Sequence, residues 1–317
     1  MKALLSKSLL LLFLFGALSI GSYKMNNYLI VRYGFALKDT TEILITGSSL
    51  VTLGLDPEHI PKSENIGLAA EPIVISFFKL RDILPDKHAS LRKVVISCSL
   101  QELPNQDKVF NSNKPMVVEM FTRLSFLKKM ITLQDLKQFD VDYFSYLEVY
   151  IRNRIFPNYA FFSRWMKQDK KNCDIESLLH IGGFQKNSSF NQRQVGRRRM
   201  DPKRYVSKYF PEDRRDEKIS PVNYQYLDSI ARLCQERNIE LVAVGMPVSK
   251  ELYEEIPESY RNYYKEKMKD LASLPHCRYI NLTHTAENDW FSDLIHLNEK
   301  GALQISLVIK RELNKAL

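Results

Sequence analysis

The stretch KVVISCSL (Lys93–Leu100) decides the fold class, because its apolar residues continue without alternating with polar ones. A run of this kind is typical of a strand buried on both faces, as in parallel sheets that helices cover on each side. Similar runs occur at EILIT (Glu42–Thr46), IELVAVGMP (Ile239–Pro247) and CRYINL (Cys277–Leu282). With a short fifth strand over NIGLA (Asn65–Ala69), they predict one largely parallel sheet.

Helical patterns lie between these strands. The segment Pro72–Leu84 opens with proline at a position suited to a first helical turn. The segment Asn223–Asn238 has apolar residues at helical spacing and leads directly into a strand, and His296–Leu317 ends the chain as an amphipathic helix. Strands that alternate with helices predict an α/β fold, here a three-layer α/β/α sandwich with a parallel sheet.

Residues 103–220 interrupt this alternation. Helix-like segments are predicted over Met116–Ile131 and Asp135–Phe156, and a polar stretch with weak periodicity follows from Lys167 to Ser220. We interpret this region as a large, mainly helical insertion into a single domain that covers residues 25–317. A separate domain is the alternative.

The first 24 residues have the layout of a targeting segment. Two lysines precede an uncharged apolar run from Ser8 to Ser22, and Lys24 closes it. This layout is typical of a signal peptide or signal anchor, although the run is shorter than the about 20 residues of a spanning helix. We therefore expect residues 25–317 to lie outside the cytoplasm, either periplasmic or extracellular, and either anchored to the membrane or secreted after cleavage.

Composition excludes several classes of site. The 317 residues carry a formal net charge of +9, but an exported chain without a recognition motif is not expected to bind nucleic acid. None of the four cysteines has metal-ligand spacing, so neither a metal nor another cofactor is predicted. Cys98 and Cys277 lie in or beside strand-like runs and are predicted to be small buried residues.

Two distant segments together suggest catalysis by a serine. Gly47-Ser48-Ser49 follows the first strand, and Asp293 and His296 stand three residues apart before the last helix. A serine hydroxyl is a poor nucleophile unless a base takes its proton. An imidazole whose tautomer is fixed by a carboxylate is such a base. The neighbouring Asp289 is an alternative acid.

These segments resemble the motifs of the SGNH/GDSL hydrolase superfamily. Gly47-Ser48-Ser49-Leu50 is similar to its Gly-Asp-Ser-Leu block, and Asp293-Leu294-Ile295-His296 to its Asp-x-x-His block. Asn65-Ile66-Gly67 resembles the block whose glycine N–H helps to form the oxyanion hole. The resemblance implies that Ser49 is the nucleophile, that His296 and Asp293 complete a triad, and that the N–H groups of Ser49 and Gly67 receive the oxyanion.

The third block of this superfamily, Gly-x-Asn-Asp, is different here. The corresponding residues read Ser97-Cys98-Ser99-Leu100-Gln101, with no asparagine to complete the oxyanion hole. Loss of one such donor typically lowers turnover by about a hundred- to a thousandfold. Ser99, Gln101 or the backbone is a possible substitute, and a weakly active or inactive member is the alternative.

Gly-Ser-Ser with the following Gly54-Leu55-Asp56-Pro57, behind an N-terminal membrane segment, resembles exported bacterial proteins of cell-surface acylation. These include alginate O-acetylation and teichoic-acid D-alanylation proteins. The resemblance implies an acyltransferase that acts on a cell-surface glycan, with acyl-donor machinery and the membrane as partners. Two alternatives stay open: an esterase that releases acyl groups to water, and a catalytically weak binding or assembly component.

A basic cluster is the remaining candidate binding feature. It is interpreted either as a solvated loop or as a site for an anionic partner, such as an acidic glycan or a phospholipid surface. Its members are Arg197, Arg198, Arg199, Lys203 and Arg204.

Overall fold

The computed structural model describes residues 2–33, 37–69, 71–84, 90–103, 144, 147, 183–186, 201–210 and 221–315. The chain divides into two compact units, one of Met1–Ala36 with Phe110–Ile181 and one of Leu37–Val109 with Gly182–Leu317. The second unit contains the sheet, and it includes the described end of the predicted insertion. The helices predicted within residues 116–156 lie outside the described residues, except for two single helical positions, 144 and 147.

Five strands form one parallel sheet in the order β2-β1-β3-β4-β5. The predicted α/β sandwich is therefore confirmed, and four strands lie where the apolar runs predicted them. The strands are β1 (Ile43–Thr46), β2 (Ser63–Asn65), β3 (Lys93–Ser97), β4 (Glu240–Gly245) and β5 (Cys277–Asn281). The strand order reverses between β1 and β3, and ligands of open α/β sheets bind at the carboxyl end of such a switch point.

The fifth strand was predicted two residues too late. Strand β2 occupies Ser63–Asn65 and pairs with β1 at the edge of the sheet, with Ile43 opposite Ser63 and Ile45 opposite Asn65. The apolar residues after Asn65 belong to a loop that continues along β1, where Leu68 N–H donates to the Gly47 carbonyl at 2.9 Å. Pairing with β1, rather than apolar character, therefore determines the position of this edge strand.

The three helices predicted over Pro72–Leu84, Asn223–Asn238 and His296–Leu317 are confirmed with shifted ends. The last helix begins at Glu299 rather than His296, because the Asn298 side chain accepts the Gly301 N–H at 3.0 Å and caps it. The helices of the sheet unit are α2 (Ser49–Gly54), α3 (Ile73–Ile83), α11 (Pro202–Tyr209), α12 (Pro221–Glu236), α13 (Lys250–Glu255), α14 (Glu258–Ala272) and α15 (Glu299–Leu313), with short 3-10 turns η1 (Pro57–His59) and η3 (Asn288–Trp290).

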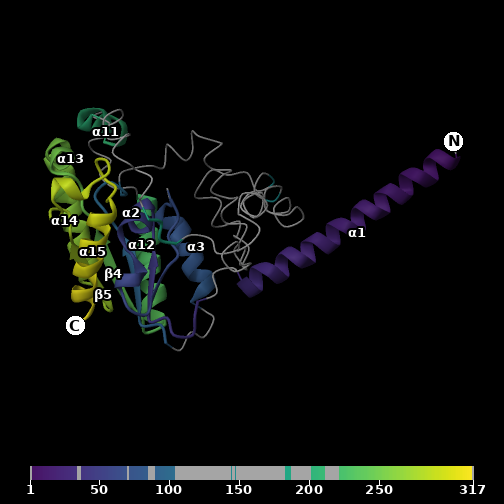
Figure 1. Cartoon of the computed structure of the whole chain (residues 1–317), viewed down its shortest axis with the longest axis horizontal. Helices are drawn as coiled ribbons and strands as arrows, with labels where there is room; N and C mark the ends of the chain where they lie inside the picture. The colour runs from purple at the N-terminus through teal and green to yellow at the C-terminus, as the bar shows by residue number, and fades with distance from the viewer. Residues whose placement is uncertain are drawn as a thin grey trace. The chain divides into compact units, whose positions relative to one another are not determined.

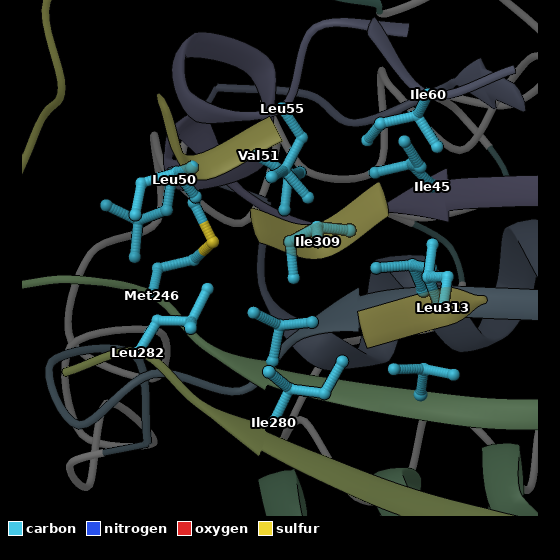
Figure 2. Packing of buried hydrophobic residues seen from close by; sticks show 14 of the residues in the cluster. Ile45, Leu50, Val51, Leu55, Ile60, Met246, Ile280, Leu282, Ile309 and Leu313 are labelled. Atoms are coloured by element: carbon cyan, nitrogen blue, oxygen red, sulfur yellow. The ribbon is translucent and has the colours of Figure 1, made fainter. Parts of the chain in front are cut away.

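Helices cover both faces of the sheet (Figure 1). On one face, Ile305, Ile309 and Leu313 of α15 pack with residues of α2 against side chains of β1, β3, β4 and β5 (Figure 2). Helices α3 and α12 pack against each other over the opposite face. Burial of these two apolar faces fixes the strand ends, and thereby the loops that carry the candidate site.

The described cysteines are free thiols inside the sheet unit. Cys98, Cys234 and Cys277 are buried, as predicted for Cys98 and Cys277, and none of the three forms a disulfide. Burial raises the pKa of the Cys277 thiol to about 11, so it carries little thiolate at neutral pH. The fourth cysteine, Cys173, lies outside the described residues.

The N-terminal segment forms one long helix, α1 (Lys2–Tyr33). Its stretch Ser6–Met25 covers 20 residues and is apolar enough to cross a membrane. This stretch is longer than the run Ser8–Ser22 read from the sequence and reaches the length that a hydrocarbon core requires. By length and composition, α1 therefore suits a signal anchor or a single membrane span.

Candidate active site

Ser49 stands at the start of α2, directly after the carboxyl end of β1. The tight turn before it depends on Gly47, which has a φ of +134° and whose Cβ, if present, would lie 2.2 Å from the Ser97 Oγ. Ser48 caps α2, because its Oγ accepts the Leu50 N–H at 3.2 Å. The turn and the cap together hold Ser49 at the edge of the sheet.

The structure brings the three predicted triad residues together. The Ser49 Oγ lies 2.8 Å from His296 Nε2, although 247 positions separate the two residues. On the other side of the ring, His296 Nδ1 lies 2.7 Å from Asp293 Oδ2. Both distances are in the hydrogen-bonding range expected for a nucleophile, a base and the group that orients the base.

A tight loop fixes the acid and the base. The second carboxylate oxygen of Asp293 accepts the backbone N–H groups of Ile295 (2.9 Å) and His296 (2.8 Å). Ser292 N–H donates to the His296 carbonyl at 2.8 Å, and Ser249 N–H donates to the Leu294 carbonyl at 3.0 Å. This loop therefore presents the imidazole to Ser49 from a backbone tied at several points.

The charge state of Asp293 suits its proposed role. Burial alone would raise the pKa of its carboxyl, but the interactions with His296 and with two backbone N–H groups outweigh burial and lower it. Asp293 therefore stays ionised at neutral pH, next to a ring that gains positive charge when it takes a proton. The alternative acid, Asp289, is exposed and pairs instead with the Lys300 ammonium at 2.5 Å.

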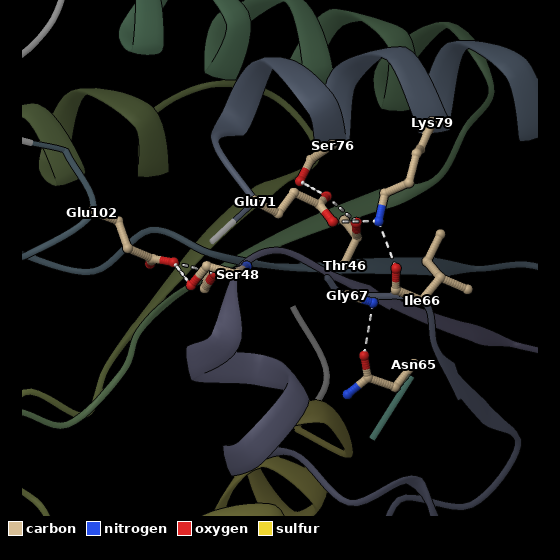
Figure 3. Close-up of polar contacts among 10 residues, drawn as sticks. Thr46, Ser48, Asn65, Ile66, Gly67, Glu71, Ser76, Lys79 and Glu102 are labelled. Carbon is tan, nitrogen blue, oxygen red and sulfur yellow. Dashed lines mark hydrogen bonds and ion pairs between the residues drawn. The ribbon is translucent and has the colours of Figure 1, made fainter. Parts of the chain in front are cut away.

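The two N–H groups predicted to receive the oxyanion differ in their hydrogen bonds. Ser49 N–H has no hydrogen-bond partner among the described residues, so this donor is uncommitted. Gly67 N–H, by contrast, donates to the Asn65 Oδ1 at 2.9 Å (Figure 3). The Gly67 N–H is thus engaged in this structure, because the Asn65 side chain folds back two residues and accepts it, and the role of Gly67 toward an oxyanion stays a prediction.

The two proposed substitutes for the missing asparagine differ. Ser99 is committed, because its Oγ accepts the Met246 N–H at 2.9 Å in the interior and its side chain also hydrogen-bonds Glu102. Gln101 is 4% exposed, and within the described part of the chain its amide nitrogen and oxygen have no hydrogen-bond partner. Buried polar groups are normally paired, so of these two residues only Gln101 keeps an uncommitted donor.

Sequence reasoning missed Glu102, which lies just after β3. Its Oε1 accepts the Ser97 hydroxyl at 2.9 Å, and its Oε2 accepts the Ser99 N–H at 2.9 Å. The Ser48 hydroxyl also donates to Oε1 (Figure 3). The residue as a whole is half-buried, but desolvation of its carboxyl group raises the pKa, while hydrogen bonds from the three serines oppose this shift. No local sequence pattern signals this residue.

Two described parts of the predicted insertion lie near the site. Burial raises the pKa of Tyr205 on α11, and the charges of Tyr209, Asp293 and Glu102 raise it further. Gly183 N–H donates to the Gly67 carbonyl at 3.0 Å, and Gln185 N–H donates to the Thr52 carbonyl at 2.7 Å. The insertion thus returns to the sheet unit beside the nucleophile.

The structure describes two residues of the predicted basic cluster. Lys203 and Arg204 lie on α11, with exposed side chains. The other members, Arg197, Arg198 and Arg199, lie outside the described residues. Two cations of the cluster therefore stand on the same helix as Tyr205.

A buried ion pair supports the loop after β2. Lys79 Nζ lies 2.6 Å from Glu71 Oε2 and donates to the Ile66 carbonyl at 2.5 Å (Figure 3). Ser76 and Thr46 donate to the other oxygen of Glu71 at 2.6 and 3.3 Å. The side chains of this pair are 1% and 0% exposed, so the loop that contains Gly67 rests on an ion pair inside the protein.

Comparison with protein-family models finds no match to this chain, and comparison with curated proteins finds none either. We therefore infer the function from the geometry of the site. A hydroxyl, an imidazole and a carboxylate in series allow a serine to attack an acyl carbonyl and to hold the acyl group as an ester.

Proposed function

We propose that the chain is an exported SGNH-type serine acyltransferase that acts on a cell-surface glycan. The observation that carries the proposal is the hydrogen-bonded series Ser49–His296–Asp293, at 2.8 and 2.7 Å. His296 takes the Ser49 proton as Ser49 attacks the acyl donor, and returns it to the leaving group. The Ser49 ester then passes its acyl group to a glycan hydroxyl, which His296 deprotonates in the same way.

Two further observations support transfer at a cell surface. Helix α1 contains a stretch long and apolar enough for a membrane anchor, which would keep the site close to envelope substrates. Lys203 and Arg204 are exposed on α11, in the described part of the predicted insertion. Exposed cations favour an anionic acceptor, such as an acidic glycan.

A second candidate function is a catalytically weak assembly component of a glycan-acylation system. The engaged Gly67 N–H favours it, because only the Ser49 N–H remains of the two predicted oxyanion donors. An esterase would share the triad and differ from a transferase only in using water as the acceptor.

Turnover distinguishes these candidates. The full-length chain in detergent is mixed with p-nitrophenyl acetate, with and without glycan oligosaccharides from the cell surface. A transferase should hydrolyse the ester slowly and consume it several-fold faster when the oligosaccharide is present, with acetyl recovered on the sugar. An esterase should hydrolyse p-nitrophenyl acetate rapidly in water, and the oligosaccharide should not change its rate.

The assembly role is tested in cells. A strain with Ser49→Ala is compared with a full deletion, and acyl groups on the surface glycan are quantified. The proposal expects both strains to lose acylation. Normal acylation in Ser49→Ala, with loss in the deletion, would establish the assembly role and reject catalysis.

The orientation of the sheet unit is tested independently. If α1 anchors an exported domain, alkaline phosphatase fused after Leu317 should be active, because it folds only outside the cytoplasm. β-Galactosidase at the same position should be inactive. The reverse pattern of the two reporters would place the domain in the cytoplasm and remove the cell-surface substrate.

A further inference from the structure

Glu102 is the one described carboxylate that connects the nucleophile turn with the end of β3. It contacts the side chains of Ser48 and Ser97, which come from the ends of β1 and β3. Among the described residues no cation pairs with it, whereas the nearby Glu71 pairs with Lys79. Within the described residues, this carboxylate is held by hydroxyl and N–H donors, and it lies directly beside a candidate nucleophile.

The contacts of Glu102 determine the orientation of Ser48. The Ser48 Oγ donates to Glu102 and accepts the Leu50 N–H at 3.2 Å. The Ser48 N–H approaches the Ser97 Oγ at 3.4 Å, and the same Ser97 hydroxyl donates to Glu102. Glu102 thus fixes the Ser48 hydroxyl directly, and it fixes the Ser48 N–H through the Ser97 hydroxyl.

Glu102 contacts Ser48 and not the triad itself. Ser48 is 7% exposed and its hydroxyl already makes two hydrogen bonds, so it is poorly placed to attack a substrate. Ser49 is more exposed, and its hydroxyl faces His296. Any effect of Glu102 on Ser49 therefore passes through the backbone of the residue before it.

We propose that Glu102 is a positioning residue, which anchors Ser48 and Ser97 so that the Ser49 hydroxyl stays aligned with His296 Nε2. This inference rests on the proposed function, because it assigns Glu102 a part in Ser49 acylation. It also explains why serines occupy the positions where the sequence departs from the resembled motifs. Ser48, Ser97 and Ser99 are all hydroxyl donors to the same carboxylate.

The test is the rate at which p-nitrophenyl acetate acetylates Ser49 in the full-length, detergent-solubilised chain, followed by mass spectrometry. Glu102→Gln keeps the size of the side chain but replaces one acceptor oxygen by an amide donor that faces hydroxyl donors. Misalignment of about 1 Å costs about a hundredfold in rate, so we expect a fall of tenfold to a hundredfold. Because substrate contacts are unchanged, the loss should appear in kcat rather than in KM.

Glu240→Gln is the matched control. Glu240 is a buried carboxylate on β4 at the opposite, amino end of the sheet, where it pairs with Lys93 at 2.5 Å and Arg278 at 2.8 Å. The same isosteric change there should lower thermal stability without altering the acetylation rate per folded molecule. An equal fall in rate for both variants would show that general destabilisation, and not positioning, is responsible.

A reciprocal variant keeps the proposal testable if Glu102→Gln folds poorly. Ser48→Asp alone would place two carboxylates in contact and should lower the rate. Ser48→Asp combined with Glu102→Gln restores one carboxylate facing one amide donor, and should recover a substantial part of the rate lost in Glu102→Gln.

The outcomes separate the two proposals. A Glu102→Gln rate within twofold of the unaltered protein, while Ser49→Ala forms no adduct, would overturn the positioning role and leave the proposed function intact. Acetylation of Ser48 in place of Ser49 would also overturn it. If the unaltered protein forms no serine adduct at all, the proposed function and the role of Glu102 both fail.

Discussion

Replacing Ser49 with alanine is expected to abolish acylation of the protein by an activated ester, because the Ser49 hydroxyl is the group that lies 2.8 Å from His296 Nε2. Replacing His296 with alanine should reduce acylation almost as far. In serine hydrolases, loss of the nucleophile or of the base lowers turnover by about 10⁶-fold, and Asp→Asn in the triad by about 10⁴-fold. The measurement is intact-protein mass spectrometry over time, with p-nitrophenyl acetate as the donor.

Asp293→Asn and Asp289→Asn form a matched pair. The two residues are four positions apart, but Asp293 contacts His296 Nδ1, whereas Asp289 is exposed and contacts Lys300. The first change should nearly abolish acylation, and the second should leave the rate within twofold. Similar rates for the two variants would contradict the assignment of the acid.

The pH profile is a further readout of this prediction. The pKa of Asp293 is lowered, so its carboxylate keeps its charge down to acidic pH. Protonation of Asp293 should therefore contribute to a loss of acylation rate only at acidic pH below the ordinary range of an aspartic acid.

Lys79→Met is expected to have the largest effect on stability. The change leaves Glu71 inside the protein without its cation and removes the donor to the Ile66 carbonyl. Removal of one partner of a buried ion pair typically costs about 3–5 kcal/mol of unfolding free energy. Urea titration of the full-length chain in detergent, followed by tryptophan fluorescence, should show a loss of this size.

The companion variant Glu71→Gln with Lys79→Met distinguishes loss of the pair from loss of packing. Without the charge on either partner, most of the stability should return, since neutral replacements of buried pairs are often well tolerated. The loss of unfolding free energy in Lys79→Met alone should also become smaller as the pH falls. The folded state would then hold Glu71 as a neutral acid, with a pKa above that of the unfolded chain, and so gain stability by binding a proton. A pH-independent loss would point to packing alone.

The fold could be predicted largely from the sequence because its strands are buried on both faces. Runs such as Lys93–Ser97 and Glu240–Gly245 carry their signal locally, in continuous Val, Ile, Leu and Ala. Strand β2 carries no such signal, because Ser-Glu-Asn becomes a strand only through pairing with β1. Helix α14 was not predicted, although its buried residues Tyr260, Tyr264, Met268 and Leu271 recur at helical spacing among many charged neighbours.

The residues of the candidate site likewise differ in whether a local sequence pattern predicts them. Ser49, Asp293 and His296 could be predicted because their chemistry and chain order form a pattern. The engagement of Gly67 could not, because it depends on the rotamer of the Asn65 side chain. Glu102 could not either, since its partner Ser48 lies 54 positions away and neither residue type is unusual in its own segment. Contacts between side chains of distant segments are determined by packing, which composition and periodicity do not describe.

The insertion between β3 and β4 has a consequence for the order in which the protein forms. Strands β1 and β3 can pair soon after they are made, but the contact of Lys93 with Glu240 joins residues 147 positions apart. Closing a loop of that length costs about 2 kcal/mol more than closing the short β1–β2 connection. Parallel pairing over such a distance is also slow. We therefore expect the part of the sheet that carries His296 to join the part that carries Ser49 late in folding. A chain that is still being made or exported then has Ser49 without its base, and it is inactive in acyl transfer until the sheet is complete.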